Sequence, residues 1–107
     1  FYSNARNNLD KIIDEEINIS VINKIELLSF SQVEQNLIDF VNESNVYGLD
    51  EDIVAQTIKI RKEHRIKLPD AIIAATALLF NFTLITNNTK DFKKLEHLNL
   101  INPYNDF

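Results

Sequence analysis

The fold is decided by residues 68–80, Leu68-Pro-Asp-Ala-Ile-Ile-Ala-Ala-Thr-Ala-Leu-Leu-Phe80, a stretch that is apolar nearly all round yet begins with a carboxylate. Pro69 suits the first position of a helix, where its missing N–H costs no hydrogen bond. Asp70 then lies in the first turn, where the helix dipole favours negative charge. A helix that is apolar on every side is buried. The stretch therefore predicts a central helix that carries Asp70 to a point where several elements meet, although an Asp after a Pro is also simply a good helix start.

The composition limits the classes of protein that the chain can be. With 107 residues, 45% apolar and 25% charged, residues 1–107 are expected to form a single compact domain with one core. No apolar run reaches the roughly 20 residues that a membrane span needs, and no secretory leader stands at residue 1. We therefore expect a cytoplasmic protein with no membrane contact.

The residue types also limit the cofactors. The chain has no cysteine and only two histidines, His64 and His97, which argues against disulfides, thiolate metal sites and a His-rich zinc site. Any metal is expected to be held by oxygen ligands. A single glycine, Gly48, argues against the glycine-rich phosphate loops of nucleotide-binding proteins.

Charge is distributed unevenly along the chain. Residues 1–58 carry three basic and eleven acidic side chains, whereas residues 59–107 carry eight basic and five acidic ones. Five of the basic residues fall between Lys59 and Lys67, just before Asp70. This stretch is either a phosphate-attracting patch or an ordinary solvated helix face.

Strands and helices alternate along the sequence. Strands are expected at 17–21, 46–49, 83–86 and 99–101, and helices within 1–15 and at 23–28, 31–43, 51–64 and 68–80, with a short helical segment after the turn at 87–91. Such alternation predicts an α/β fold, a three-layer α/β/α sandwich around a mostly parallel sheet. The chain is expected to begin inside a helix, without a first strand.

Particular residues define the expected helix boundaries. Asn23 is the expected cap of the helix at 23–28, and Ser31 to Glu34 has the pattern of a capping box. Asp50 is the expected cap of the helix at 51–64, whose core face is expected to include Val54 and Ile58.

Four oxygen-bearing side chains are expected at one edge of the sheet. In an open α/β sheet, functional groups gather outside the carboxyl ends of the strands. Glu26 follows the first expected strand, Asn88 and Asp91 follow the third, and Asp70 opens the helix before it. Taken singly, these residues could be a solvated helix residue, a turn former, a helix cap and a helix start. Together they predict a crevice of carboxylates, which selects Mg²⁺ or Mn²⁺ because hard cations prefer oxygen ligands. Such ions activate water and stabilise charge on a phosphoryl group.

Three sequence blocks resemble those of a PIN domain of the VapC toxin type. They are residues 19–28, the Leu-Pro-Asp-Ala block from Leu68 with Ala74 and Ala75, and residues 84–92, Leu-Ile-Thr-Asn-Asn-Thr-Lys-Asp-Phe. Their order and spacing match across residues 17–103.

This resemblance implies a Mg²⁺- or Mn²⁺-dependent endoribonuclease that cleaves RNA, is held inactive by a cognate antitoxin protein, and is a candidate homodimer. It implies metal ligation by Asp70, Glu26 and Asp91, and a catalytic set of Glu26, Asp70, Asn88 and Asp91. The family's first strand, which ends in an Asp-Thr-Asn motif, has no counterpart here. Because that Asp is a principal metal ligand, metal binding and activity of this chain are expected to be weak.

Two other functions remain open at this point. A truncated or degenerate PIN-like domain could bind a protein partner or RNA without catalysis. A phospho-acceptor or small-ligand domain would need a lysine beside its acidic cluster, a position that Lys90 next to Asp91 only weakly supports.

Overall fold

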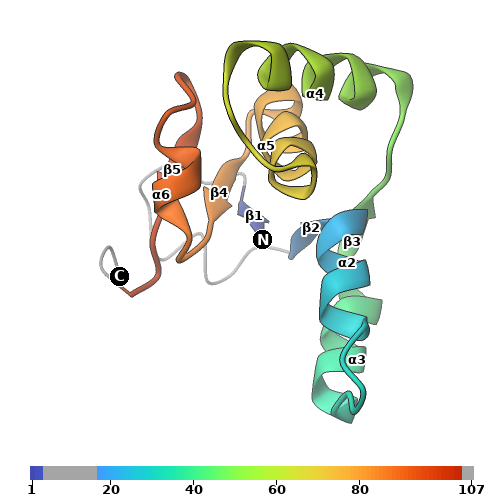
Figure 1. Ribbon diagram of the computed structural model, residues 1–107. Helices are drawn as coiled ribbons and strands as arrows, with labels where there is room; N and C mark the ends of the chain where they lie inside the picture. The colour runs from blue at the N-terminus through green and yellow to red at the C-terminus, as the bar shows by residue number, and fades with distance from the viewer. Residues whose placement is uncertain (4–16, 105–107) are drawn as a thin grey trace.

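The computed structural model describes residues 1–3 and 17–104, which form a five-stranded sheet surrounded by helices (Figure 1). The elements in chain order are β1 (Tyr2–Ser3), β2 (Asn18–Ser20), α2 (Val21–Leu28), α3 (Gln35–Glu43), β3 (Asn45–Tyr47), α4 (Glu51–Glu63), α5 (Leu68–Phe80), β4 (Thr83–Ile85), α6 (Thr89–Phe92) and β5 (Asn99–Ile101). The α/β class and the alternation of strands and helices are confirmed.

The sheet has the strand order β3-β2-β1-β4-β5. Two parallel pairs, β2 with β3 and β4 with β5, lie on either side of β1. β1 itself runs antiparallel to both neighbours, with Tyr2 opposite Asn18 on one side and Leu84 on the other. The expected helix within 1–15 is therefore wrong at residues 2–3, which form the first strand and hold the central position of the sheet, and residues 4–15 lie outside the described residues. A two-residue strand is too short for sequence periodicity to detect. The sheet is mixed, with two parallel and two antiparallel pairings, rather than mostly parallel.

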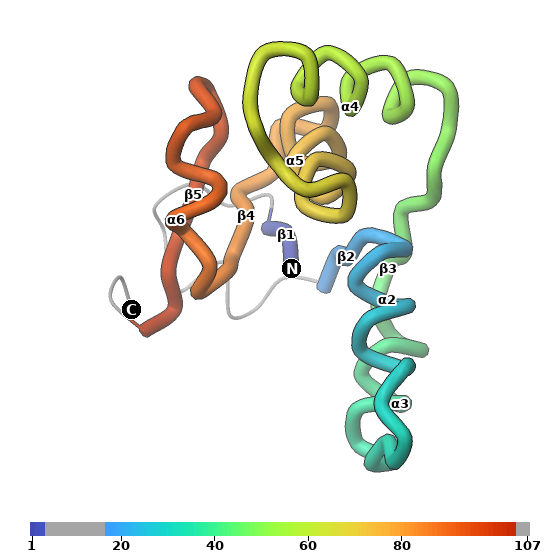
Figure 2. The backbone as a smooth tube through the Cα atoms, viewed as in Figure 1, coloured from blue at the N-terminus to red at the C-terminus, as the bar shows by residue number. Residues whose placement is uncertain are grey.

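Helix α5 is the central helix that its composition predicts. All residues from Ala71 to Ala77 are buried. The helix packs against α4 and also against β2 and β4, the two strands that flank β1 in the sheet, as the tube in Figure 2 traces. The Tyr2 hydroxyl donates a 2.7 Å hydrogen bond to the carbonyl oxygen of Ile73, which ties β1 to α5.

The end of α5 is joined to the sheet by an aromatic cluster. Asn81 ends the helix in the left-handed conformation, with φ 56°, and β4 begins two residues later. Phe82 stacks on Tyr2 with ring centroids 5.3 Å apart. Tyr47 and Phe80 complete the cluster around Phe82.

Two expected helix starts are wrong. The N-cap of α2 is Ser20, whose hydroxyl accepts from the Ile22 N–H, while the Asn23 side chain accepts from the Ser20 N–H. Asn23 is thus the third helical residue of a capping box, and the helix begins about one turn earlier than the sequence pattern predicts. The helix after Ser31 begins later than expected, at Gln35, and Glu34 takes the cap position without a side-chain hydrogen bond.

Helix α4 begins as expected but turns a different face to the core. The Asp50 carboxylate accepts from the Ile53 N–H at 2.9 Å, which confirms the expected cap. The buried residues are Ile53, Thr57 and Ile60. Val54 and Ile58, which were expected in the core, are about half exposed, because α5 covers only a narrow stripe of α4. In the described part of the chain, no helix is long and apolar enough to cross a membrane.

Candidate functional site

The topology brings the start of α5 to the carboxyl edge of the sheet. β4 follows α5 after two residues, so the helix runs back along the strand and its first turn lies toward the end where β4 finishes. β2 runs in the same direction as β4, since both are antiparallel to β1. Helix α2, which starts directly after β2, therefore leaves from the same edge, as Figure 1 shows.

Asp70 and Asp91 form the acidic centre of this edge. Asp70 is half-buried in the first turn of α5, and Asp91 is half-buried in α6, the short helix after β4. Helices α5 and α6 pack against each other. The two carboxylates are close enough for the charge of Asp91 to act on Asp70.

Asn88 completes this centre. Its side-chain amide donates a 3.1 Å hydrogen bond to Oδ2 of Asp91. Its own backbone N–H donates to the Thr86 hydroxyl at 3.1 Å, which shapes the turn after β4. Thr86 is a residue that the sequence reasoning missed, although a threonine two positions before the turn residue is a recognisable signal for such a turn.

The environment of Asp70 disfavours its charged form. Burial raises the pKa of the Asp70 carboxyl above its usual range, and the neighbouring negative charge of Asp91 raises the pKa further, while Lys67 acts in the opposite direction. A carboxylate that is held beside a second carboxylate gains stability when a cation neutralises the pair.

Glu26 lies in a different hollow of the same edge. This hollow has a volume of about 290 Å³ and is lined by Phe1, Ile19, Asn23, Glu26, Leu27 and Phe40. Phe1 joins this hollow to β4, because its carbonyl oxygen accepts from the Ile85 N–H at 2.7 Å. The structure therefore groups Asp70, Asn88 and Asp91 and leaves Glu26 beside the neighbouring strand.

The oxygen atoms of Asp70, Asp91 and Asn88 suit a hard divalent cation, which they would bind with modest affinity. Among residues 1–3 and 17–104, no three acidic or histidine side chains are grouped so that they could hold one ion. Asp70 and Asp91 supply two carboxylates, and Asn88 adds an amide oxygen. Mg²⁺ commonly takes one or two carboxylates from a protein and keeps several waters, so the pair fits this ion even though the three expected carboxylate ligands do not form one group.

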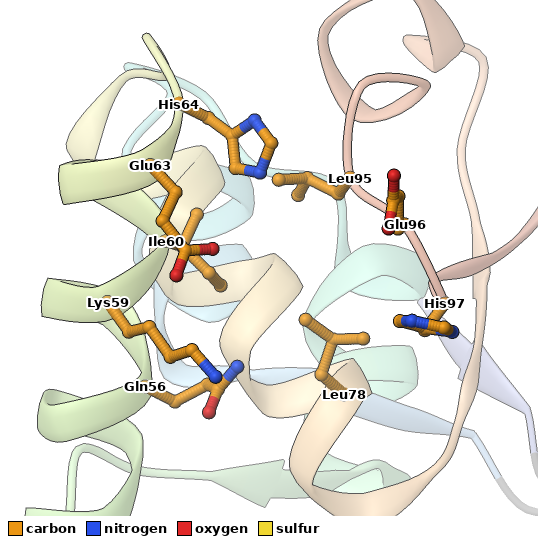
Figure 3. Close-up of a pocket in the computed structure, with 9 residues that line it drawn as sticks. All are labelled: Gln56, Lys59, Ile60, Glu63, His64, Leu78, Leu95, Glu96 and His97. Carbon is orange, nitrogen blue, oxygen red and sulfur yellow. The ribbon is translucent and has the colours of Figure 1, made fainter.

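The two histidines line a second hollow, His64 from the end of α4 and His97 from the turn before β5. This hollow has a volume of about 450 Å³ and opens between α4, α5 and that turn (Figure 3). Glu63, Glu96 and Leu78 also line it. This hollow does not contain any of the four expected site residues.

An α/β fold with a carboxylate pair at the edge of its sheet agrees with a direct comparison of the sequence, in which residues 2–98 match the model of the PIN domain family. The chain belongs to the PIN domain family. Within that family, the proteins to which the chain is similar include members of the VapC group. The chain is 38% identical over 58 residues to a protein named Ribonuclease VapC from Rickettsia bellii, an alignment that covers 51% of this chain and 43% of the relative. The chain thus matches less than half the length of that relative.

Solved structures similar to this chain are toxin–antitoxin complexes. A toxin–antitoxin complex from Klebsiella pneumoniae contains a chain that is 34% identical, with a TM-score of 0.66 and coverage of 79% of this chain and 72% of the other. VapBC2 from Rickettsia felis, bound to a DNA fragment from its promoter, has 29% identity, a TM-score of 0.69 and coverage of 84% and 76%. VapBC-1 from nontypeable Haemophilus influenzae has 27% identity, a TM-score of 0.67 and coverage of 83% and 75%. The resemblance read from the sequence is confirmed.

Proposed function

We propose that this chain is the nuclease part of a toxin–antitoxin system, a divalent-metal-dependent endoribonuclease. The observation that carries the proposal is the Asp70–Asp91 pair at the carboxyl edge of a PIN fold, with Asn88 hydrogen-bonded to Asp91. The naming of the Rickettsia bellii relative as a ribonuclease supports the same reaction.

Asp70 and Asp91, with the amide oxygen of Asn88, would hold Mg²⁺ or Mn²⁺ in this proposal. When bound, such an ion polarises a phosphoryl group and makes a water molecule more acidic. The residues of the chain have separate tasks. Asp70 and Asp91 supply the negative charge, and the Asn88 amide fixes the orientation of the Asp91 carboxylate.

Glu26 is proposed as a further acidic member of the site. Support comes from its position on α2, which starts at the same edge of the sheet as α5 and packs against that helix. Because Glu26 lies beside the hollow that Phe1 lines, we place it next to the Asp70–Asp91 pair rather than within it.

An antitoxin protein is the proposed partner, since the similar solved structures are toxin–antitoxin complexes. A homodimer and a cytoplasmic location stay predictions from the sequence and the family resemblance.

A non-catalytic role is the second candidate, and a specific feature favours it. The central strand β1 consists of Tyr2 and Ser3, so it brings no carboxylate to the acidic edge. A domain with a weakened metal site could keep the fold and act by binding RNA or a protein partner.

RNA cleavage in the presence and absence of metal decides between these two functions. We expect Mg²⁺ or Mn²⁺ to support cleavage of RNA and EDTA to abolish it. Asp70→Asn and Asp91→Asn should each lower the rate by about 100-fold, which corresponds to a loss of about 2.7 kcal/mol of transition-state stabilisation. Glu43→Gln, which removes an exposed carboxylate at the end of α3, is the matched control and should leave the rate unchanged.

Three other results of the cleavage assay would contradict parts of this proposal. Cleavage that EDTA does not affect would refute the metal dependence. Full activity of both Asn variants would remove the proposed site. An absence of cleavage with either metal, together with binding of RNA or antitoxin, would establish the non-catalytic role.

A further inference from the structure

Basic side chains are concentrated in two chain segments, one just before Asp70 and the other around Asp91 in the sequence. Eight of the nine lysine and arginine residues in the described parts of the chain lie between positions 59 and 94. They fall into two segments, residues 59–67 at the end of α4 and in the loop before α5, and residues 90–94 in and after α6.

A hydrogen bond joins these two segments into one surface. The Lys94 ammonium donates to the backbone carbonyl of Arg65. Segments that are 29 positions apart in the chain therefore lie side by side. Lys67 belongs to the first segment and acts electrostatically on Asp70, and Lys90 of the second segment is next to Asp91 in the chain. Each basic segment thus contains a lysine close in the chain to one member of the acidic pair.

The first segment contains an open hollow. It has a volume of about 440 Å³ and is lined by Arg61, Lys62, Glu63, His64, Arg65 and Ile66. Three of these side chains are cationic and one, Glu63, is anionic. The cationic side chains are exposed, and no ion pair to another described residue holds them. Exposed cations without partners are available to phosphate groups.

The hollow lies near the acidic pair. Arg65 and Asp70 are five positions apart in the chain, so their Cα atoms are at most about 18 Å apart even for a fully extended chain. Lys67, at the near end of the basic segment, is only three positions from Asp70 and is therefore closer than this limit.

We infer that this hollow binds the phosphodiester backbone of the RNA strand a few nucleotides from the phosphate that reaches Asp70 and Asp91. The inference rests on the proposed nuclease function and names the surface that delivers the substrate. Contacts to phosphates position a strand without reading its bases. The hollow therefore contributes affinity and register to cleavage, and base preference arises elsewhere.

The first test measures RNA binding by the full chain in EDTA, where no cleavage occurs. The probe is a fluorescently labelled single-stranded RNA, and its anisotropy is followed at several salt concentrations. A variant in which Arg61, Lys62 and Arg65 are all changed to Gln should bind on the order of tenfold more weakly. Its log–log salt slope should be shallower by about 2, because each lost phosphate contact on a single strand contributes about 0.7.

Two single variants serve as matched controls. Lys24→Gln removes the one described lysine outside the basic surface and should leave both affinity and slope unchanged. Glu63→Gln removes the negative charge from the hollow and should strengthen binding about twofold to threefold, since it abolishes a repulsion with phosphate. A thermal melt checks that the triple variant is folded.

The second test uses substrates of two lengths to distinguish the contribution of the hollow from that of the acidic pair. On a long RNA, the triple variant should raise KM and leave kcat almost unchanged. On a dinucleotide, which cannot reach the hollow, the triple variant and the parent should have the same kcat/KM.

The outcomes distinguish failure of this inference from failure of the proposed function. Equal affinity and equal salt slope for parent and triple variant would refute RNA binding at the hollow, whether or not the protein cleaves RNA. An equal loss on the dinucleotide would also overturn it, because the basic side chains would then act at the cleaved phosphate. If the parent protein never cleaves RNA but the triple variant loses RNA binding, RNA binding at the hollow is supported and the proposed nuclease activity is refuted.

Discussion

Tyr2 is the residue whose removal tests the central position of β1 most directly. Its side chain is fully buried, its ring stacks on Phe82, and its hydroxyl donates to the Ile73 carbonyl of α5. Tyr2→Phe deletes only the hydrogen bond and should lower the free energy of unfolding by about 0.5–1.5 kcal/mol. Tyr2→Ala also deletes the ring and should cost about 3–5 kcal/mol.

The same side chain predicts a difference at alkaline pH. Burial raises the pKa of Tyr2 above its ordinary value of 10.0. The folded state then holds the phenol proton at pH values where the unfolded chain releases it. The stability difference between parent and Tyr2→Phe should be constant below pH 10 and should shrink above it, by up to about 1.4 kcal/mol per pH unit.

Urea unfolding followed by circular dichroism measures both effects, because the signal does not depend on an aromatic reporter. The series is run at neutral pH and at several values above pH 10. If both Tyr2 variants unfold within about 0.5 kcal/mol of the parent, a threshold below the cost of one buried hydrogen bond, β1 is not the central strand. If parent and Tyr2→Phe keep a constant difference above pH 10, the hydroxyl is not buried against α5.

Three further predictions concern α5. Ala74 is fully buried, so Ala74→Leu should overpack the core and cost about 1–3 kcal/mol, and a melting temperature equal to that of the parent would show that the helix is not central. Asn81 has φ 56°, so a β-branched residue is strained there, and Asn81→Val should cost about 1–2 kcal/mol in urea unfolding, whereas an unchanged midpoint would argue against the left-handed helix end. The pKa of Asp70 is raised above 3.8, so the folded state favours the protonated carboxyl and stability falls as pH rises through the range above 3.8. Asp70→Asn should therefore melt slightly higher than the parent at pH 7 without metal, and Mg²⁺ should raise the melting temperature of the parent alone; a lower melt for Asp70→Asn would contradict this reasoning.

The sequence predicts those elements whose signals are local. The bounds of α5 are predicted to the residue, because its apolar composition and the Leu-Pro-Asp start are sufficient in themselves. Asp50 is likewise a correct cap, since an N-cap needs only its own side chain and a backbone N–H three residues later. β4 forms within the expected strand at 83–86, and all three of its residues are buried.

Features that depend on distant contacts are not predictable in the same way. The direction of β1 is set by its pairing with strands 16 and more residues away, and Val54 is exposed because α5 covers a different stripe of α4. The candidate site shows the same division. Asn88 and Asp91 are neighbours through a local turn, whereas the separation of Glu26 from Asp70 and Asp91 depends on how three helices leave the edge of the sheet.

The antiparallel β1 divides the sheet into two units with different opening behaviour. β2 with β3, and β4 with β5, are each joined over three residue pairs. β1 contributes one pair to β2 and two to β4. Among the described elements, α5 also packs against a strand of each unit, β2 and β4. Opening of β1 would therefore loosen the connection between the β2–β3 unit, beside which Glu26 lies, and the β4–β5 unit, beside which Asp91 lies, without breaking either parallel pair. Such a sub-global opening is the kind of event that amide hydrogen exchange detects. The Ile85 amide, which donates to Phe1, should then exchange faster than the Thr86 amide, which donates to Ile101 within the parallel unit.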